Sequence, residues 1–176
     1  MHITSLPGQY GVGTLGREAF AFVDFLKESG QSVWQLLPLT PTGYGDSPYQ
    51  SCSAFAGNPY LIDIPFLLEA GLLTREDTEA FAWGEDPERV DFGLQYQNRF
   101  ALLKIAFGRF TDKDALDAFC RKNAEWLPDF ALFMALKDAN DGKSWYQWDE
   151  DIKVRKPDAM RKARLKLWKE ISFYSF

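Results

Sequence analysis

A short and almost wholly apolar run, VWQLLPL at 33–39, is the feature that most limits how this chain can fold. An uninterrupted apolar run of this length is typical of a strand buried on both faces, as in a parallel sheet covered by helices. Proline cannot donate to a sheet ladder, so Pro38 predicts that the strand ends there. The run therefore predicts an α/β fold.

The segment before this run has the pattern of a helix from Arg17 to Ser29. Its polar side chains gather on one face and its apolar side chains, Phe20 and Val23 among them, on the other. Gly30 supplies a C-terminal stop. A helix followed at once by a buried strand fits the alternation of an α/β protein.

A long segment rich in glycine, proline, serine and asparagine follows the run, at 40–65. Loops longer than about 12–15 residues without regular structure are uncommon and are often functional. Ligand sites of α/β proteins lie beyond the carboxyl ends of their strands. We therefore expect the functional site in this loop.

Helical patterns fill most of the chain after residue 64. Pro65 fits the first position of a short helix that ends at Gly71, and Thr74 with Asp77 has the pattern of an N-terminal capping box. Further helices are expected at 93–110, 111–122, 128–138 and 157–176.

Composition excludes several classes of function. The net charge of −5 argues against a nucleic-acid binder, and no apolar run is long enough to cross a membrane. No secretory signal precedes residue 20, so a cytoplasmic location is expected. Cys52 and Cys120 stand far apart, and His2 is the one histidine. Reduced thiols and no metal site are therefore expected.

Three segments together resemble a known family. They are HITSLPGQYGVGTLG at 2–16, GQSVWQLLPLTPTGYGDSPYQSCSAFAGNPYLID at 30–63, and WLPDFALFMALKD at 126–138. They resemble the amylomaltases, which are 4-α-glucanotransferases of glycoside hydrolase family 77, called disproportionating enzymes in plants. The resemblance covers essentially the whole chain, and GYGDSPYQ at 43–50 is its most specific part.

The resemblance implies the N-terminal portion of a (β/α)8 TIM barrel, with about its first two strands and a mainly helical inserted subdomain. The run at 33–39 then matches the second barrel strand. Residues 1–64 are expected to begin the catalytic barrel and to carry the glucan-binding loop. Residues 65–142 are expected to form the helical insertion, and 143–176 a truncated connection and helix that return to the barrel.

The family transfers segments of α-1,4-glucan to another glucan or to glucose through a covalent glycosyl-enzyme intermediate, without a cofactor. Retaining transfer needs two carboxyl groups about 5–5.5 Å apart, a nucleophile and an acid/base. In this family they lie on later barrel strands. We therefore expect no catalytic residue within the chain and no activity from it alone, with the carboxylates lying beyond residue 176.

Three residues of the loop are candidate substrate-binding residues. By resemblance, Tyr49 stacks under a glucose ring near the cleavage point, and Ser47 donates or accepts hydrogen bonds with sugar hydroxyls. Tyr44 lies between Gly43 and Gly45, so it is expected to be exposed, and by resemblance it contacts glucan at a secondary site. The structural alternatives are a tyrosine packed under the loop and an ordinary turn serine.

Other residues of this region are expected to have structural roles. Asp46 is expected to hold the loop and Asp63 to cap a helix. His2 has no nucleophile elbow near it. The expected partners are maltooligosaccharides or other α-1,4-glucans, with no nucleic acid and no membrane. An α-amylase-type hydrolase, a non-catalytic glucan-binding module and a purely structural helical domain are the alternatives.

Overall fold

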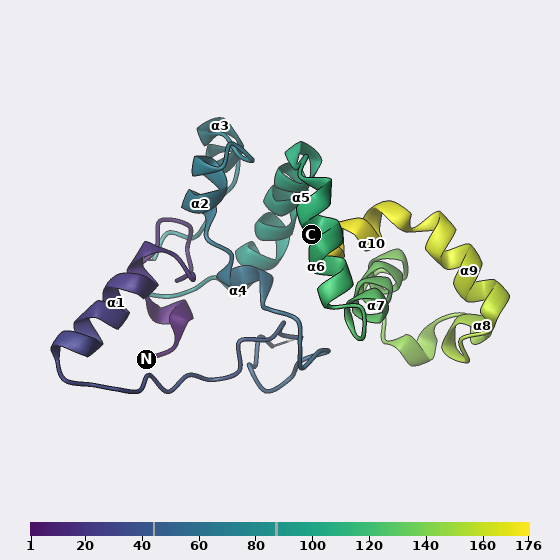
Figure 1. The fold of residues 1–176 in the computed structure, drawn as a ribbon, viewed down its shortest axis with the longest axis horizontal. Helices are drawn as coiled ribbons and strands as arrows, with labels where there is room; N and C mark the ends of the chain where they lie inside the picture. Colours follow the sequence, from purple (N-terminus) through teal and green to yellow (C-terminus); the bar gives the residue numbers. More distant parts are fainter. Residues whose placement is uncertain (44, 87) are drawn as a thin grey trace. The chain divides into compact units, whose positions relative to one another are not determined.

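The computed structural model describes residues 1–43, 45–86 and 88–176, which form two compact units, Met1–Phe110 and Thr111–Phe176 (Figure 1). Each unit has its own apolar core. The sequence-based domain boundaries at 64 and 142 stay predictions. No helix of the described residues has the length and apolar character needed to cross a membrane.

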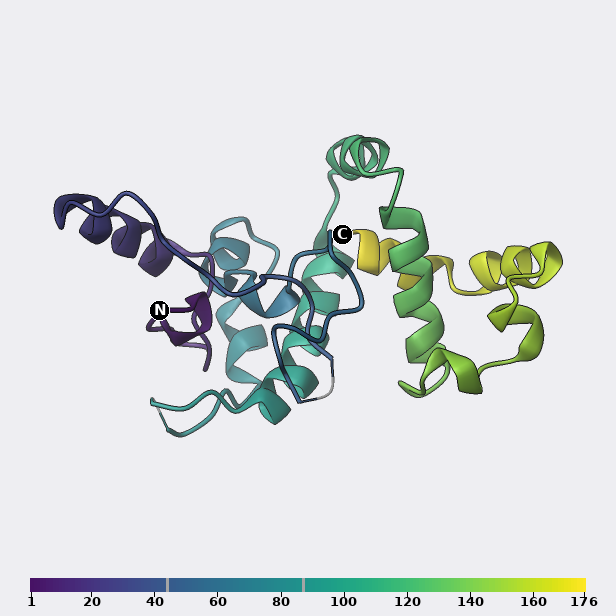
Figure 2. The same ribbon diagram turned by 90° about the horizontal axis from the view of Figure 1, so that it is seen from below.

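The first unit combines helices with long irregular segments (Figures 1 and 2). Its helices are α1 Arg17–Glu28, α2 Ile64–Glu69, α3 Arg75–Glu79, α4 Phe92–Leu94 and α5 Phe100–Arg109, with 3-10 turns at Ile3–Ser5 and Pro59–Leu61 and a π-helical turn at Gln95–Arg99. The helix expected at 93–110 is therefore divided into α4, the π-helical turn and α5.

The expected α/β fold, a partial (β/α)8 TIM barrel, is wrong for this structure. Among the described residues there is no strand, and the nearest approach to one is an isolated antiparallel bridge between Thr42 and Ser51. The run at 33–39 is irregular, and Val33 is 78% exposed. A strand needs a neighbouring backbone to pair with. Among the described residues, the backbone of this run makes a single hydrogen bond, in which the Leu39 carbonyl accepts from the Asn58 N–H.

One side of the run nevertheless packs on the first core of this unit. Trp34, Leu36 and Leu39 contact a buried cluster of Ile3, Leu6, Ala19 and Leu61. The Trp34 indole also donates to the Met1 carbonyl at 2.8 Å. The apolar side chains of the run are therefore partly buried against this core. The pattern had predicted a strand buried on both faces.

A second core of the same unit lies where α2 and the following turn meet α5. Its buried residues are Ile64, Leu73, Leu102 and Ala106. The predicted capping box of α3 is confirmed: the Asp77 N–H donates to the Thr74 hydroxyl at 3.3 Å, and the Thr74 N–H donates to the Asp77 carboxylate at 2.7 Å. Arg109 of α5 also pairs with this carboxylate, which joins α3 to α5.

Replacing Asp77 by asparagine is expected to lower the melting temperature near neutral pH. The Arg109 guanidinium, and after it the Thr74 N–H, hold the pKa of the Asp77 carboxyl far below its ordinary value of 3.8. A carboxyl with a lowered pKa stabilises the fold above its ordinary pKa and loses that contribution as the pH falls through the folded-state pKa. The difference between wild type and Asp77→Asn should therefore shrink below about pH 4.

Thermal melts of the protein followed by circular dichroism across this pH range make the measurement. Asp158→Asn is the matched control, because Asp158 pairs with Arg161 at 3.0 Å on an exposed helix face, where such pairs contribute little. An Asp77→Asn protein that melts like the Asp158→Asn protein at every pH would contradict the prediction.

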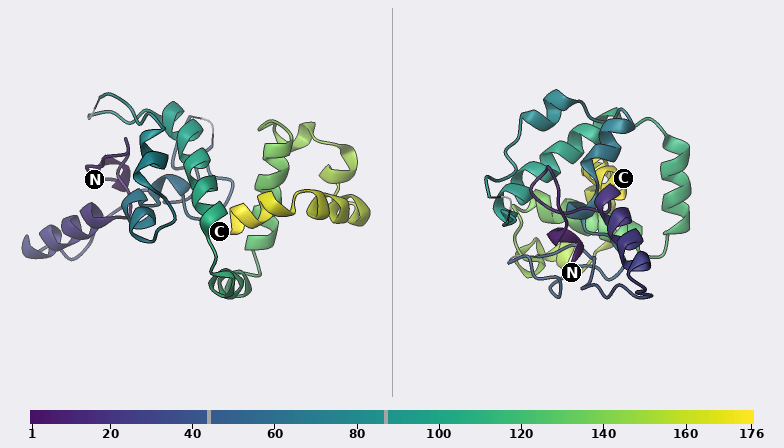
Figure 3. Two further views of the ribbon diagram at one scale, coloured as in Figure 1. Left: turned by 90° about the horizontal axis from the view of Figure 1, so that it is seen from above. Right: turned by 90° about the vertical axis from the view of Figure 1, so that its left-hand side faces the viewer.

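The second unit is helical (Figures 1 and 3). Its helices are α6 Lys113–Lys122, α7 Leu127–Ala139, α8 Glu150–Lys153, α9 Pro157–Lys166 and α10 Trp168–Ser175, with a 3-10 turn at Trp145–Gln147. Helix α10 packs on α7. The single helix expected at 157–176 is interrupted at Leu167, whose ψ of 24° is not helical. The core of this unit comprises Leu132, Leu136, Trp148, Met160 and Ala163.

Candidate functional site

The loop between Leu39 and Asn58 is closed by backbone hydrogen bonds at two levels. At its base, the Asn58 N–H donates to the Leu39 carbonyl at 2.9 Å. Further out, the Gly43 N–H donates to the Gln50 carbonyl at 2.9 Å, next to the bridge between Thr42 and Ser51. The segment that carries GYGDSPYQ is therefore a closed turn on a fixed base.

Asp46 stabilises this turn through hydrogen bonds to other residues of the loop. Its backbone is left-handed, with φ at 53°, a conformation that aspartate tolerates better than most residues. Its N–H donates to the Gly43 carbonyl at 3.1 Å, and its carboxylate lies 3.4 Å from the donating Thr42 hydroxyl. These bonds are local to the loop, which agrees with the structural role expected for Asp46.

The turn presents Tyr49 to solvent. The side chain is 73% exposed, so the alternative of a tyrosine packed beneath the loop does not describe it. Ser47 lies two residues away and is half-buried, with its hydroxyl accepting from the Tyr49 N–H at 3.4 Å. The Gln50 N–H donates to the Ser47 carbonyl at 3.0 Å. Tyr44, the third predicted site residue, lies outside the described residues.

The arrangement can bind a ligand that has both flat apolar faces and hydroxyl groups. An exposed phenol ring offers an apolar face with a polar edge. A serine hydroxyl beside it can donate and accept hydrogen bonds. No group of metal-ligating side chains occurs in the described part of the chain. The exposed ring and the neighbouring hydroxyl are together suited to binding such a ligand.

Tyr60, on the 3-10 turn that follows the base of the loop, was missed by the sequence analysis. It is 5% exposed and packs against the rings of Phe92 and Phe100, with centroid distances of 6.1 and 6.4 Å. Burial, and next the Asp46 carboxylate, raise the pKa of Tyr60 to about 12. Its phenol is therefore neutral at physiological pH. Tyr60 follows an Asn-Pro pair, and this local sequence does not indicate that the tyrosine is buried.

Asp63 has the helix-capping role expected of it, and His2 is engaged in capping a 3-10 turn. The Asp63 carboxylate accepts from the Thr14 hydroxyl at 2.5 Å and from the Phe66 N–H at 3.1 Å, which caps α2. The His2 ring caps the first 3-10 turn through Thr4, and burial lowers its pKa. Neither side chain has a hydrogen bond to the described residues of the Tyr49 turn.

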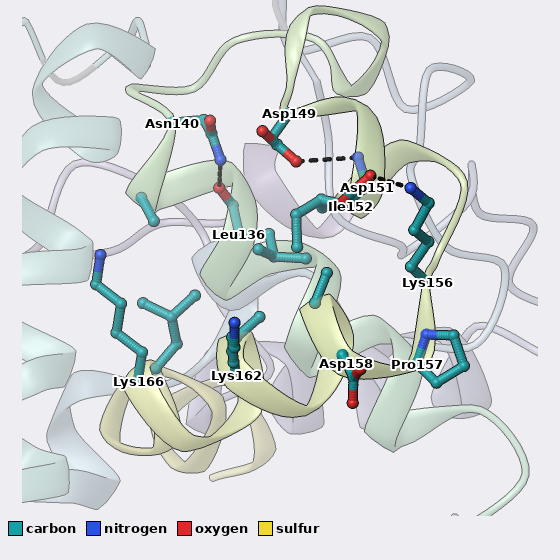
Figure 4. A pocket seen from close by; sticks show the side chains of 14 residues that line it. Leu136, Asn140, Asp149, Asp151, Ile152, Lys156, Pro157, Asp158, Lys162 and Lys166 are labelled. Atoms are coloured by element: carbon teal, nitrogen blue, oxygen red, sulfur yellow. Dashed lines mark hydrogen bonds and ion pairs between the residues drawn. The ribbon is translucent and has the colours of Figure 1, made fainter.

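The second unit contains a separate open hollow of about 830 Å³ (Figure 4). It lies between the end of α7, α8 and α9, with Leu136 and Ile152 among its apolar lining. Lys156 pairs with Asp151 at 2.6 Å, and this hydrogen bond raises the pKa of Lys156. Asp149 is engaged in capping α8. No predicted site residue lines this hollow.

Comparison with known proteins identifies the family to which the chain is similar. The family model described as 4-alpha-glucanotransferase matches residues 1–176. A 4-alpha-glucanotransferase of Thermus thermophilus is 50% identical over 182 residues, an alignment that covers 100% of this chain and 35% of the relative. One of Clostridium butyricum is 45% identical over 178 residues, covering 100% of this chain and 37% of the relative.

A solved structure gives the same result in three dimensions. An amylomaltase from Streptococcus agalactiae, in complex with acarbose, has a TM-score of 0.93 and 43% sequence identity, over 99% of this chain and 36% of that one. The chain thus spans little more than a third of the length of the relatives it matches.

Proposed function

This chain belongs to the 4-alpha-glucanotransferase family, and from that premise we propose that the protein carrying it transfers segments of α-1,4-glucan to an acceptor glucan or to glucose. In this proposal the chain supplies part of the surface that binds the glucan. The cytoplasmic location expected from the sequence stays a prediction.

The exposed Tyr49 ring on the closed turn is the observation that carries the proposal. Sugar rings have apolar C–H faces and polar rims, which an aromatic ring and a nearby hydroxyl complement. A tyrosine loses little side-chain entropy on binding, and a turn closed by hydrogen bonds is already ordered. We therefore propose that Tyr49 stacks on a glucose unit and that Ser47 bonds its hydroxyls. Tyr44 stays a predicted contact at a secondary site.

The chemistry proposed for the protein is retaining double displacement. A carboxylate attacks the anomeric carbon while a carboxylic acid protonates the leaving oxygen. The acceptor hydroxyl then displaces the enzyme carboxylate and gives its proton to the second carboxylate, which now acts as the base. Asp46 and Asp63 are occupied in the loop and in a helix cap. We assign the nucleophile and the acid/base to neither of them, and the role proposed for this chain is to position the sugar.

Incubating the gene product that contains this sequence with maltotriose tests the proposal. A transferase should produce glucose together with a series of longer maltooligosaccharides, separable by thin-layer or anion-exchange chromatography. Glucose and maltose alone would instead identify an α-amylase-type hydrolase. Binding without turnover would identify a glucan-binding module, and no binding would leave a structural domain.

A further inference from the structure

Two polar side chains are wholly buried on the π-helical turn between α4 and α5. Gln95 and Arg99 are each 0% exposed. Burying a guanidinium is costly unless its N–H groups are well paired, and a hydrophobic side chain of similar size is often as stabilising. Single π-helical turns are rare and occur frequently at functional sites. The pair therefore requires an explanation beyond core stability.

The two side chains connect three segments that are distant in sequence. The Gln95 amide donates to the Tyr10 carbonyl at 2.8 Å, and Arg99 Nη1 donates to the Ile62 carbonyl at 3.2 Å. Arg99 Nε donates to Gln95 Oε1 at 3.2 Å, which links the two contacts. We call this set of hydrogen bonds the Gln95–Arg99 clamp.

The clamp acts on the base of the Tyr49 loop. Ile62 follows Asn58, the residue that closes the loop, by one 3-10 turn. The same segment is held from its other side, because the Leu15 N–H donates to the Leu61 carbonyl at 2.9 Å. The base of the loop is thus fixed between the N-terminal segment and the π-helical turn.

The clamp is retained at an electrostatic cost. Arg99 Nη2 has no hydrogen-bond partner among the described residues. Burial lowers the pKa of Arg99 to about 10, although the neighbouring Asp63 carboxylate acts in the opposite direction. The guanidinium therefore stays protonated at neutral pH and lies 5.6 Å from the centroid of the Trp83 ring. A buried cation with an unpaired N–H group is therefore weak evidence for a purely stabilising role.

We propose that Gln95 and Arg99 are positioning residues that set the geometry of the Tyr49 loop through Ile62. The proposal rests on the proposed function for its kinetic consequence, and on the hydrogen bonds above for its structural one. It assigns Arg99 no contact with the substrate, since the side chain is fully buried.

A double-mutant cycle in the gene product tests the kinetic consequence. Arg99→Met removes the hydrogen bond to Ile62 and is expected to lower kcat/KM for maltotriose roughly tenfold. In a Tyr49→Ala background the same change should have an effect of less than about threefold, because the residue it positions is gone. Arg99→Lys keeps a donor and a charge at this site, so it should recover most of the activity. Equal effects of Arg99→Met in both backgrounds would overturn the proposal.

Hydrogen exchange measured by mass spectrometry tests the structural consequence without any substrate. Peptides that cover 10–16 and 58–63 should exchange roughly tenfold faster in Arg99→Met than in wild type. Arg109→Met is the matched control, because it removes an arginine of α5 that pairs with Asp77 and lies outside the clamp. Unchanged exchange in these peptides would overturn the proposal. If wild type fails to transfer glucan, the proposed function fails and the exchange result still decides the clamp.

Discussion

Replacing Gly11 by alanine is expected to prevent the first unit from reaching its native structure. Gly11 has a φ of 71°, a left-handed conformation that costs alanine about 1–2 kcal/mol. An added Cβ would also overlap the Trp83 carbonyl oxygen and lie 2.8 Å from the Gln95 amide nitrogen. The Gln95 amide cannot retreat freely, because it donates to the adjacent Tyr10 carbonyl. The combined loss should exceed about 4 kcal/mol, the range of the most damaging substitutions.

Soluble yield and thermal unfolding of the Gly11→Ala protein measure this effect. Gly30→Ala is the matched control, because Gly30 has a φ of 73° but no atom within 4 Å of an added Cβ. The control therefore carries the backbone penalty without the overlap, and it should fold with a modestly lower melting temperature. Similar behaviour of the two variants would show that the close approach of Gly11 to Trp83 is not a constraint.

Local features of the fold could be predicted from the sequence because their causes are local. The capping box of Thr74 and Asp77 uses side chains three residues apart, and it forms as expected. The helix at Arg17–Glu28 forms and ends before Gly30 as expected, although Phe20 and Val23 of its apolar face are exposed in the structure. Asp46 and Asp63 bond to nearby backbone or loop groups, so their roles too could be inferred from turn chemistry.

The run at 33–39 shows that strand formation could not be predicted from a local pattern alone. Its apolar residues predicted that other parts of the protein bury them, but the pattern does not identify which segments these are. In the structure Trp34 and Leu36 pack on a small core while Val33 and Leu37 are exposed. Strand formation depends on a neighbouring backbone far away in sequence. A single segment cannot reveal whether that neighbour is present.

The candidate site likewise has a part that the sequence could predict and a part that it could not. The Tyr49 turn could be proposed from its glycines and from the resemblance to a family, because the most specific part of that resemblance lies within this one loop. The Gln95–Arg99 clamp could not, because Gln95 bonds a residue 85 positions away and Arg99 one 37 positions away. In a helical pattern each looks like a solvent-facing polar residue. Their burial becomes visible only when the three segments are placed together.

In the gene product that contains this sequence, and on the proposed function, replacing Tyr49 by alanine is expected to reduce glucan transfer sharply while leaving the fold intact. Removal of the ring takes away the apolar surface on which a sugar stacks, which should lower kcat/KM for maltotriose by roughly tenfold to a hundredfold. The side chain is 73% exposed and contributes little to either core, so the melting temperature should hardly change. Tyr49→Phe keeps the ring and should retain most of the activity, which separates stacking from hydrogen bonding by the phenol.

Initial rates of glucose release from maltotriose, measured beside thermal melts, distinguish a lost contact from a lost fold. Tyr146→Ala is the matched control: Tyr146 is 63% exposed, on a 3-10 turn of the second unit. Its removal should leave both rate and melting temperature near wild type. If Tyr49→Ala transferred glucan as fast as Tyr146→Ala, the exposed ring would have no part in holding the sugar. The closed turn and the clamp beneath it would then require a different ligand.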